Sequence, residues 1–245
     1  MKKEYIKKEA WTKMLNFLKN TKAIYIVSEE QCKQFVEAIF WMARTGAQWR
    51  ELPENYGLWN SVYRRFNTWS KKNVWNGLFA FCVQDPDLEY LMIDTTIVRA
   101  HPCSSGYGQG LGRSKGGFTT KIHVKVDALG NPLKFIITAG QRGDITQAEE
   151  LVGMTSNSYV LADRAYDSDT LRTKLNNQNC IPIIPGKSNR KTPIFYDKHI
   201  YKERHLVECF FSKIKNFRRI FSRFDKSLRN FNAFLSFVGA LVWLR

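Results

Sequence analysis

The spacing of apolar residues predicts a helical segment over the first 85 residues. Ser28 and Gln31 have the spacing of a capping box, and Gly46 ends the pattern that follows. A second stripe over 62–69 and a short run over 74–81 predict two further helices. The apolar positions of the longest predicted helix fall on one helical face: Cys32, Phe35, Val36, Ile39, Phe40 and Ala43.

After the turn at 85–87 the pattern changes to strands. Segment 89–98 is a continuous apolar run, which predicts a buried strand ending near Asp94. Residues 119–126 alternate, which predicts a half-exposed strand, and the turn residues at 127–131 predict a hairpin to the strand that follows. In the alternating segment, Ile122, Val124 and Val126 lie on one side, and Lys121, His123 and Lys125 lie on the other.

The order of the remaining elements favours an α/β fold. Helices are predicted near 146–152 and 168–176, strands at 159–162 and 180–184, and a long helix from about residue 202. Three initial strands followed by alternating helices and strands predict a mixed sheet flanked by helices. A ribonuclease-H-like fold has this order. We expect a small all-helical N-terminal domain over 1–85 and a ribonuclease-H-like domain over 86–245.

A glycine-rich segment separates the first two predicted strands. Residues 103–117 hold six glycines together with Arg113 and Lys115, which predicts a mobile loop and not a packed element. The glycines do not have the GxGxxG spacing that cradles a phosphate. A nucleotide cofactor is therefore not expected.

The charge of the chain indicates its partner. Its 245 residues contain 38 Lys and Arg against 22 Asp and Glu, a net charge of +16. Such an excess implies a polyanion or an acidic membrane surface, and nucleic acid is the first choice. The apolar stretch 231–244 is shorter than the roughly 20 residues that cross a bilayer, so we expect no membrane segment. Five scattered cysteines without a CxxC pair, and the absence of a signal-peptide pattern, predict reduced thiols in a cytoplasmic protein.

Three carboxylates stand out against this background. Asp94 and Asp163 each end an apolar predicted strand, where a charged residue needs a partner or a metal. Glu208 lies on the C-terminal helix, on a stripe with Tyr201, Arg204, Phe211 and Lys215. Each feature alone has an ordinary explanation, as a turn residue, a helix cap or a salt-bridged helix face. Together, in a strongly basic chain, they point to one site.

Carboxylates that converge at one sheet edge repel one another unless cations lie between them. Hard oxygen ligands suit Mg²⁺ or Mn²⁺, and two such ions can activate a water or a 3′-hydroxyl and stabilise the leaving oxygen of a phosphodiester. The chemistry expected is phosphodiester cleavage and strand transfer. From Lys187 to Arg229 there are 13 Lys or Arg and four Asp or Glu, a charge of +9 around the same site.

Several blocks of the chain resemble a known family. MIDTTIVRAH, VLADRAYDSD and the spacing Tyr201-x2-Arg204-x3-Glu208-x6-Lys215 are similar to the two aspartate blocks and the Tyr-Arg-Glu-Lys signature of DDE transposases of bacterial insertion sequences. The resemblance is to the insertion-sequence-five group within the insertion-sequence-four-like class. It covers nearly the whole chain.

The resemblance implies the role of each site residue. Asp94, Asp163 and Glu208 would bind two Mg²⁺ or Mn²⁺ ions, while Tyr201, Arg204 and Lys215 would contact the transposon-end DNA. Further residues expected to contact DNA are Arg64, Arg65, Arg113, Lys115 and Arg164; a solvated helix face explains the first two equally well. The expected partner is double-stranded DNA, both transposon ends and target, bound by a homodimer or higher oligomer at the bacterial nucleoid.

Three functions remain open on the residues alone. The first is a cut-and-paste transposase that binds terminal inverted repeats, cleaves at each end and joins the 3′-hydroxyl to target DNA. The second is a catalytically inactive DNA-binding regulator derived from a transposase. The third is a stand-alone nuclease, which would cleave without joining.

Overall fold

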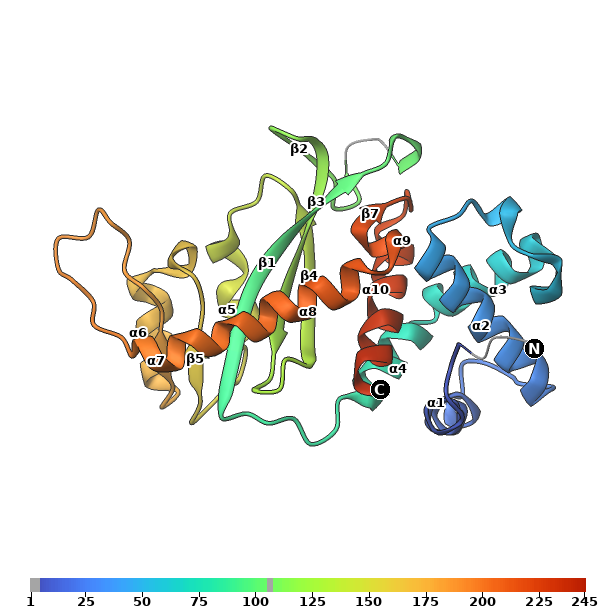
Figure 1. Ribbon diagram of the computed structural model, residues 1–245, viewed down its shortest axis with the longest axis horizontal. Coiled ribbons are helices and arrows are strands. Elements are labelled where there is room, and N and C mark those ends of the chain that lie inside the picture. Colours follow the sequence, from blue (N-terminus) through green and yellow to red (C-terminus); the bar gives the residue numbers. More distant parts are fainter. Residues whose placement is uncertain (1–4, 105–107) are drawn as a thin grey trace. The chain divides into compact units, whose positions relative to one another are not determined.

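The chain forms two compact units. The computed structural model describes residues 5–104 and 108–245 (Figure 1). Unit 1 takes its described residues from 1–84, 100–105 and 214–245, and unit 2 from 85–99 and 106–213. The C-terminal segment 214–245 therefore packs in the same unit as the N-terminal helices.

Unit 1 is helical, as predicted for the N-terminal region. Ser28 caps α2, since its hydroxyl accepts a hydrogen bond from the Gln31 N–H, and Gly46 ends the helix in the left-handed region at φ 65°. Helix α1 has no counterpart in the predictions. The elements of unit 1 are α1 (Lys8–Asn20), α2 (Glu29–Thr45), η1 (Trp49–Glu51), η2 (Glu54–Tyr56), α3 (Trp59–Lys71), α4 (Val74–Cys82), η3 (Pro102–Ser104), α9 (Arg218–Phe221), β7 (Ser222–Arg223) and α10 (Leu228–Trp243).

Helix α10 is the centre of the unit 1 core. Phe234 stacks on Phe66 of α3 with ring centroids 4.4 Å apart, and Asn76 of α4 accepts hydrogen bonds from Asn232 and Ser236. Burial in protein explains the apolar C-terminal stretch, and no described helix is long and apolar enough to cross a membrane. A division of the chain by function at residue 85 stays a prediction, and it separates α10 from the helices that it contacts.

Unit 2 contains a mixed sheet. Its strands are β1 (Tyr90–Ala100), β2 (Gly112–Ser114), β3 (Gly117–Val126), β4 (Pro132–Ala139), β5 (Tyr159–Leu161) and β6 (Ile181–Ile183). Strand β3 pairs antiparallel with β1 and β4, and β2 forms a short hairpin with the start of β3. Strands β5 and β6 continue the sheet from β1 in parallel. The order β4-β3-β1-β5-β6 confirms the predicted ribonuclease-H-like arrangement.

Helices cover both faces of this sheet (Figure 1). On one face, α5 (Ala148–Val152) and α6 (Asp169–Asn177) pack on a core that includes Leu91 and Ile93 of β1. On the other, α8 (His205–Lys215) crosses the strands, and its Phe210 stacks on Phe135 of β4. Because side chains alternate between the faces of a strand, Asp94 lies on the α8 face and Thr95 on the opposite face.

The structure corrects the predicted end of the first strand. Strand β1 does not end near Asp94 but continues to Ala100. Its antiparallel pairing with β3 runs on to Arg99, whereas its parallel pairing with β5 stops at Met92. Near Asp94, β1 therefore loses its partner β5 but keeps its partner β3. The apolar run in the sequence ends close to the point where β5 ends.

The second face of β3 is also not exposed as predicted. His123 is 0% exposed, and the ammonium groups of Lys121 and Lys125 bond to Asp144 and to the Val152 carbonyl of the segments that cover this face. Long Lys stems can cover apolar surface while their charged ends reach polar partners. A pattern of alternating polarity therefore did not mean a solvated face here.

Two segments differ from their predictions: the glycine-rich segment is more ordered, and the long C-terminal helix is divided into several shorter helices. The glycine-rich segment contains η3 and the paired strand β2, and its residues 105–107 lie outside the described part. The long helix predicted from residue 202 is a series of shorter pieces: α7 (Lys198–Tyr201), η6 (Lys202–Arg204) and α8, followed by α9 and α10. The connecting helical segment η4 (Asp144–Gln147) precedes α5, and η5 (Arg164–Tyr166) precedes α6.

Candidate active site

The register of the parallel strands places two aspartates side by side. The last parallel pair joins Met92 of β1 to Leu161 of β5. Asp94 and Asp163 each follow two residues later, and the Asp163 backbone is still extended. Side chains two residues apart lie on the same face, and paired strands are about 4.8 Å apart. Asp94 in β1 and Asp163 just beyond β5 therefore occupy matching positions, each two residues after the last parallel pair.

Asp94 is largely buried. Its side chain is 16% exposed and accepts a hydrogen bond of 2.7 Å from the Thr95 N–H. Burial raises the pKa of this carboxyl above its usual value, and the negative charge of Asp163 raises the pKa further. The Thr95 N–H and the Arg204 guanidinium act in the opposite direction. The raised pKa reflects a carboxylate for which a nearby cation is favourable.

Asp163 begins the turn that follows β5. Its Oδ1 accepts a hydrogen bond of 2.9 Å from the Ala165 N–H and caps the short helix η5. This contact holds the side chain at the sheet edge and leaves Oδ2 available. Arg164, the next residue, is exposed.

Arg204 joins the signature segment to the first aspartate. Its Nη1 lies 2.9 Å from Oδ2 of Asp94, and its Nη2 forms an ion pair with Glu208 one helical turn later. The guanidinium lies 6.0 Å from the ring centroid of Tyr201. Burial raises the pKa of the Tyr201 hydroxyl. The charge of Arg204 lowers this pKa and that of Asp163 raises it, because both charges lie near the ring. Tyr201, Arg204, Glu208 and the two aspartates therefore form one cluster.

The members of this cluster differ in exposure. The Arg204 side chain is 18% exposed, and that of Glu208 is 56% exposed. Lys215 lies at the end of α8, seven residues after Glu208, which is about 10 Å along a helix. The structure thus brings Asp94, Arg204 and Glu208 into contact and places Lys215 further along the same helix.

A buried polar network lies on the opposite face of the sheet. The Thr95 hydroxyl contacts the Tyr166 hydroxyl at 2.7 Å and His123 Nδ1 at 2.8 Å, and His123 Nε2 contacts the Thr138 hydroxyl at 2.8 Å. Burial lowers the pKa of His123 to about 4, so the ring is neutral at pH 7. A neutral imidazole has one donor and one acceptor, which suits two hydroxyl partners. The network connects Thr95, next to Asp94, with Tyr166, in the turn after Asp163.

Sequence reasoning missed this network. It placed His123 on an exposed face and gave Tyr166 no role. The signal in the sequence was weak, because Thr residues stand on both predicted neighbouring strands but Thr is common in strands. Only the pairing of Thr95 with His123 across β1 and β3 makes that signal specific.

Four further predicted DNA-contact residues lie on elements that do not contribute to this cluster. Arg64 is exposed on α3, whereas the Arg65 guanidinium lies 4.3 Å from the Phe35 ring centroid and 5.0 Å from that of Trp69. Packing within unit 1 therefore accounts for Arg65. Arg113 and Lys115 are exposed at the β2–β3 hairpin of unit 2.

The donor set fits a hard divalent cation in its chemistry. Within residues 5–104 and 108–245, no three acidic, His or Cys side chains are placed closely enough to hold a metal ion. Two of the three predicted carboxylates nevertheless occupy matching strand positions, and the third is turned onto Arg204, a positive group in the same cluster. Carboxylate oxygens are the ligands that Mg²⁺ and Mn²⁺ prefer. The residues are suited to the ions, with Glu208 needing to leave Arg204.

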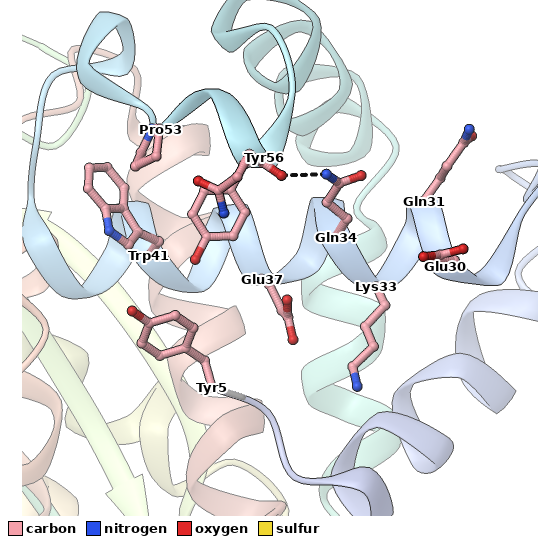
Figure 2. A pocket seen from close by; sticks show the side chains of 10 residues that line it. Tyr5, Glu30, Gln31, Lys33, Gln34, Glu37, Trp41, Pro53 and Tyr56 are labelled. Atoms are coloured by element: carbon pink, nitrogen blue, oxygen red, sulfur yellow. Dashed lines mark hydrogen bonds between the residues drawn. The ribbon is translucent and has the colours of Figure 1, made fainter. Parts of the chain in front are cut away.

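A separate pocket lies on the α2 side of unit 1. Its volume is about 650 Å³, and Figure 2 shows Trp41, Tyr56 and Tyr5 on one side of it, with Glu37 nearby. Gln34 donates to the Asn55 carbonyl at its rim. The residues predicted to act on DNA line other parts of the molecule, and the acidic groups here do not suit a phosphate.

The fold is ribonuclease-H-like, and it brings the predicted residues Asp94, Arg204 and Glu208 into contact. Residues 85–243 match the family described as "Transposase DDE domain", and residues 6–79 match "Putative transposase of IS4/5 family". The chain belongs to the DDE transposases. This family comprises nuclease and strand-transfer enzymes.

Similar proteins carry names that match this family. The chain is 42% identical over 129 residues to "Putative transposase for insertion sequence element IS6501" of Brucella ovis, a match covering 52% of this chain and 99% of the relative. It is 30% identical over 135 residues to "Putative transposase for insertion sequence element IS402" of Burkholderia cepacia, covering 50% of this chain and 62% of the relative.

Solved structures show more distant likeness. A piggyBac transposase synaptic complex with hairpin DNA has a TM-score of 0.45 at 14% identity, over 75% of this chain and 48% of that chain. A Mos1 transposase paired-end complex has a TM-score of 0.29 at 12% identity, over 79% of this chain and 77% of that chain. The assignment of the fold rests on the observed strand order.

Proposed function

We propose that this protein binds the terminal inverted repeats of an insertion sequence, hydrolyses a phosphodiester at each end and joins the freed 3′-hydroxyl to target DNA. The observation that carries the proposal is the placement of Asp94 in β1 and of Asp163 just after the parallel strand β5, each two residues beyond the last pair of the two strands, beside Arg204 and Glu208. Membership of the DDE transposases supports the same reaction class.

Three side chains would hold the metal ions of this reaction. Asp94, Asp163 and Glu208 supply hard oxygen ligands for two Mg²⁺ or Mn²⁺ ions. When bound, two such ions supply activation of a water or 3′-hydroxyl and stabilisation of the leaving oxygen. The Thr95 N–H and the Ala165 N–H each bind one carboxylate oxygen and so restrict how the two aspartates turn.

Arg204 and its neighbours are suited to hold DNA. The Arg204 guanidinium neutralises Asp94 and Glu208 in the structure, and a planar guanidinium also binds a phosphate through two parallel hydrogen bonds. We assign Tyr201, Arg204 and Lys215 to phosphates close to the cleaved bond. Arg64, Arg113, Lys115 and Arg164, exposed on their elements, add phosphate contacts that position the duplex.

The partners follow from the reaction. A chain with a net charge of +16 binds double-stranded DNA with a strong dependence on salt. The helical N-terminal region would read the ends and residues 86–245 would carry the chemistry. Because two ends must be handled together, we propose a homodimer or higher oligomer on DNA, acting at the bacterial nucleoid.

One experiment separates this function from its alternatives. The purified protein is incubated with labelled duplexes from the borders of its own gene, with Mg²⁺ or Mn²⁺ and with EDTA. Cleaved and joined products that disappear in Asp94→Asn, Asp163→Asn and Glu208→Gln, with DNA binding retained, are expected. Cleavage without joining would indicate a nuclease. Equal binding with and without metal and no cleavage at all would indicate a DNA-binding regulator.

A further inference from the structure

A long loop of unit 2 carries an exposed aromatic side chain. The loop follows β6 and leads into α7, and it projects beyond α6 and α7 as an irregular segment (Figure 1). Near its end, Phe195 is 95% exposed. Single exposed apolar residues are common, so exposure alone indicates little. The way in which this loop is held makes Phe195 different.

The first half of the loop is fixed by a buried carboxylate. Asp167 accepts hydrogen bonds from the Lys187 N–H at 2.9 Å and from Arg190 Nε at 2.6 Å. Arg190 also binds Asp169 at 2.6 Å. Asp167 follows Asp163 by four residues, so the loop is attached directly to the segment that carries the second aspartate.

The second half is fixed to the signature segment. Asp197 Oδ1 accepts hydrogen bonds from the His199 and Ile200 N–H groups and caps α7. Tyr196 packs edge-on against Tyr201, with ring centroids 5.3 Å apart at 72°. Phe195 is therefore an exposed residue that directly precedes Tyr196, the residue packed on Tyr201 of the cluster.

The hydrogen bonds to Asp167 stabilise the loop, but the exposed ring of Phe195 does not stabilise the chain. Ordering a loop has an entropic cost at every residue, and a phenylalanine that stays in water returns none of the free energy that its burial would supply. The charge around it points to a partner. From 187 to 198 the loop contains Lys187, Arg190, Lys191 and Lys198 against Asp197, a net charge of +3. Cations flanking an exposed ring suit a polyanion with apolar planar groups, which is the chemistry of DNA.

We propose that residues 187–197 form a DNA contact and that Phe195 inserts as a wedge between base pairs beside the bond to be cleaved. Apolar side chains inserted at a base step unstack it and bend the duplex, and the bend brings more backbone against the protein. This inference rests on the proposed function only in that DNA occupies the site near Arg204. In this arrangement Lys191, with Lys198 at the start of α7, would contact phosphates, while Lys187 and Arg190 hold the loop to Asp167 and Asp169.

The test compares two exposed side chains of the same unit. Phe195→Ala removes the wedge, Phe195→Trp retains an aromatic ring, and Met154→Ala, at a residue that is 99% exposed, is the matched control. The full chain is titrated with duplexes carrying the border sequence of its gene. Permanganate reactivity of thymines then reports unstacked base steps, and size-exclusion chromatography with light scattering reports self-association without DNA.

The expected result is specific to the ring. Wild type, Phe195→Trp and Met154→Ala should each make a thymine near the cleavage position reactive. Phe195→Ala should lose this reactivity and bind about 5- to 150-fold more weakly, the range that loss of a base–aromatic contact gives, with an unchanged salt slope because no charge is removed.

Three outcomes would overturn the proposal. Unchanged reactivity and affinity in Phe195→Ala would show that the ring does not enter DNA. A change of oligomeric state in Phe195→Ala without DNA would assign the ring to a contact between copies of the chain. If wild type binds DNA without cleaving it, the proposed transposase reaction fails but the permanganate comparison still decides the wedge. If wild type binds no DNA, both proposals fail.

Discussion

Replacing Arg204 by alanine should destabilise unit 2 through the charge that it leaves on Asp94. The Asp94 side chain is 16% exposed and that of Arg204 is 18% exposed, so the ion pair between them is largely removed from water. Removing one partner of a fully buried pair costs about 3–5 kcal/mol, because the remaining charge is uncompensated. Asp94 keeps its Thr95 N–H and some solvent contact. We therefore expect about 2 kcal/mol at pH 7.

The pH dependence of this loss has a definite sign. The pKa of Asp94 in the folded chain is raised by burial, so its contribution to stability is full below its unfolded pKa and is lost as pH rises through its folded pKa. Arg204 lowers that folded pKa, and its removal raises it further. The penalty of Arg204→Ala should therefore be smaller at acidic pH, where Asp94 takes up a proton, and grow toward pH 7.

Urea unfolding followed by far-ultraviolet circular dichroism measures the effect. Wild type, Arg204→Ala, Asp94→Asn and the double variant are compared at about pH 4.5 and pH 7, which completes a double-mutant cycle. Asp94→Asn in the Arg204→Ala background should restore most of the lost stability at pH 7. Equal losses at both pH values, or no restoration in the double variant, would refute a buried ion pair at this position. Glu208 contributes little to the expected value because its side chain is 56% exposed.

Three further substitutions test other contacts. Asp167→Asn should lower the free energy of unfolding by about 1–2 kcal/mol at pH 7. Burial raises the pKa of Asp167, but hydrogen bonds from Arg190 and others outweigh it and lower the pKa to about 2. The stability from these bonds is lost as pH falls through about 2, so the difference from wild type in urea midpoint should shrink below pH 4. Tyr166→Phe should lower the free energy of unfolding by about 1 kcal/mol by removing a hydroxyl from the Thr95 network, and a thermal melt identical to wild type would contradict that hydrogen bond. Gly46→Ala should cost more than Gly57→Ala, as both have positive φ but only at Gly46 would the new Cβ lie 3.0 Å from a neighbour; equal urea midpoints would argue against that close packing.

Local patterns predicted the elements that local physics decides. The capping pair at Ser28 and Gln31, and the glycine stop at Gly46, determine helix ends through contacts within four residues, and α2 follows them closely. The alternation of Ile122, Val124 and Val126 gave the buried face of β3 correctly for the same reason. The errors are different in kind. The extension of β1 beyond Asp94, and the burial of His123, depend on strands and helices far away in the chain.

The sequence by itself determined the chemistry available to this protein. Residue types and spacings in one chain state which groups exist: two aspartates after apolar runs, a Tyr-Arg-Glu-Lys stripe and a basic charge of +16. They also carry the order of strands and helices, because hydrophobic periodicity is a local property. Only the tertiary structure decided that the parallel register aligns Asp94 with Asp163, that Arg204 contacts Asp94, and that α10 packs with the N-terminal helices. Those relations are set by the packing of segments more than 60 residues apart, where burial and charge balance, and not local preference, choose the arrangement.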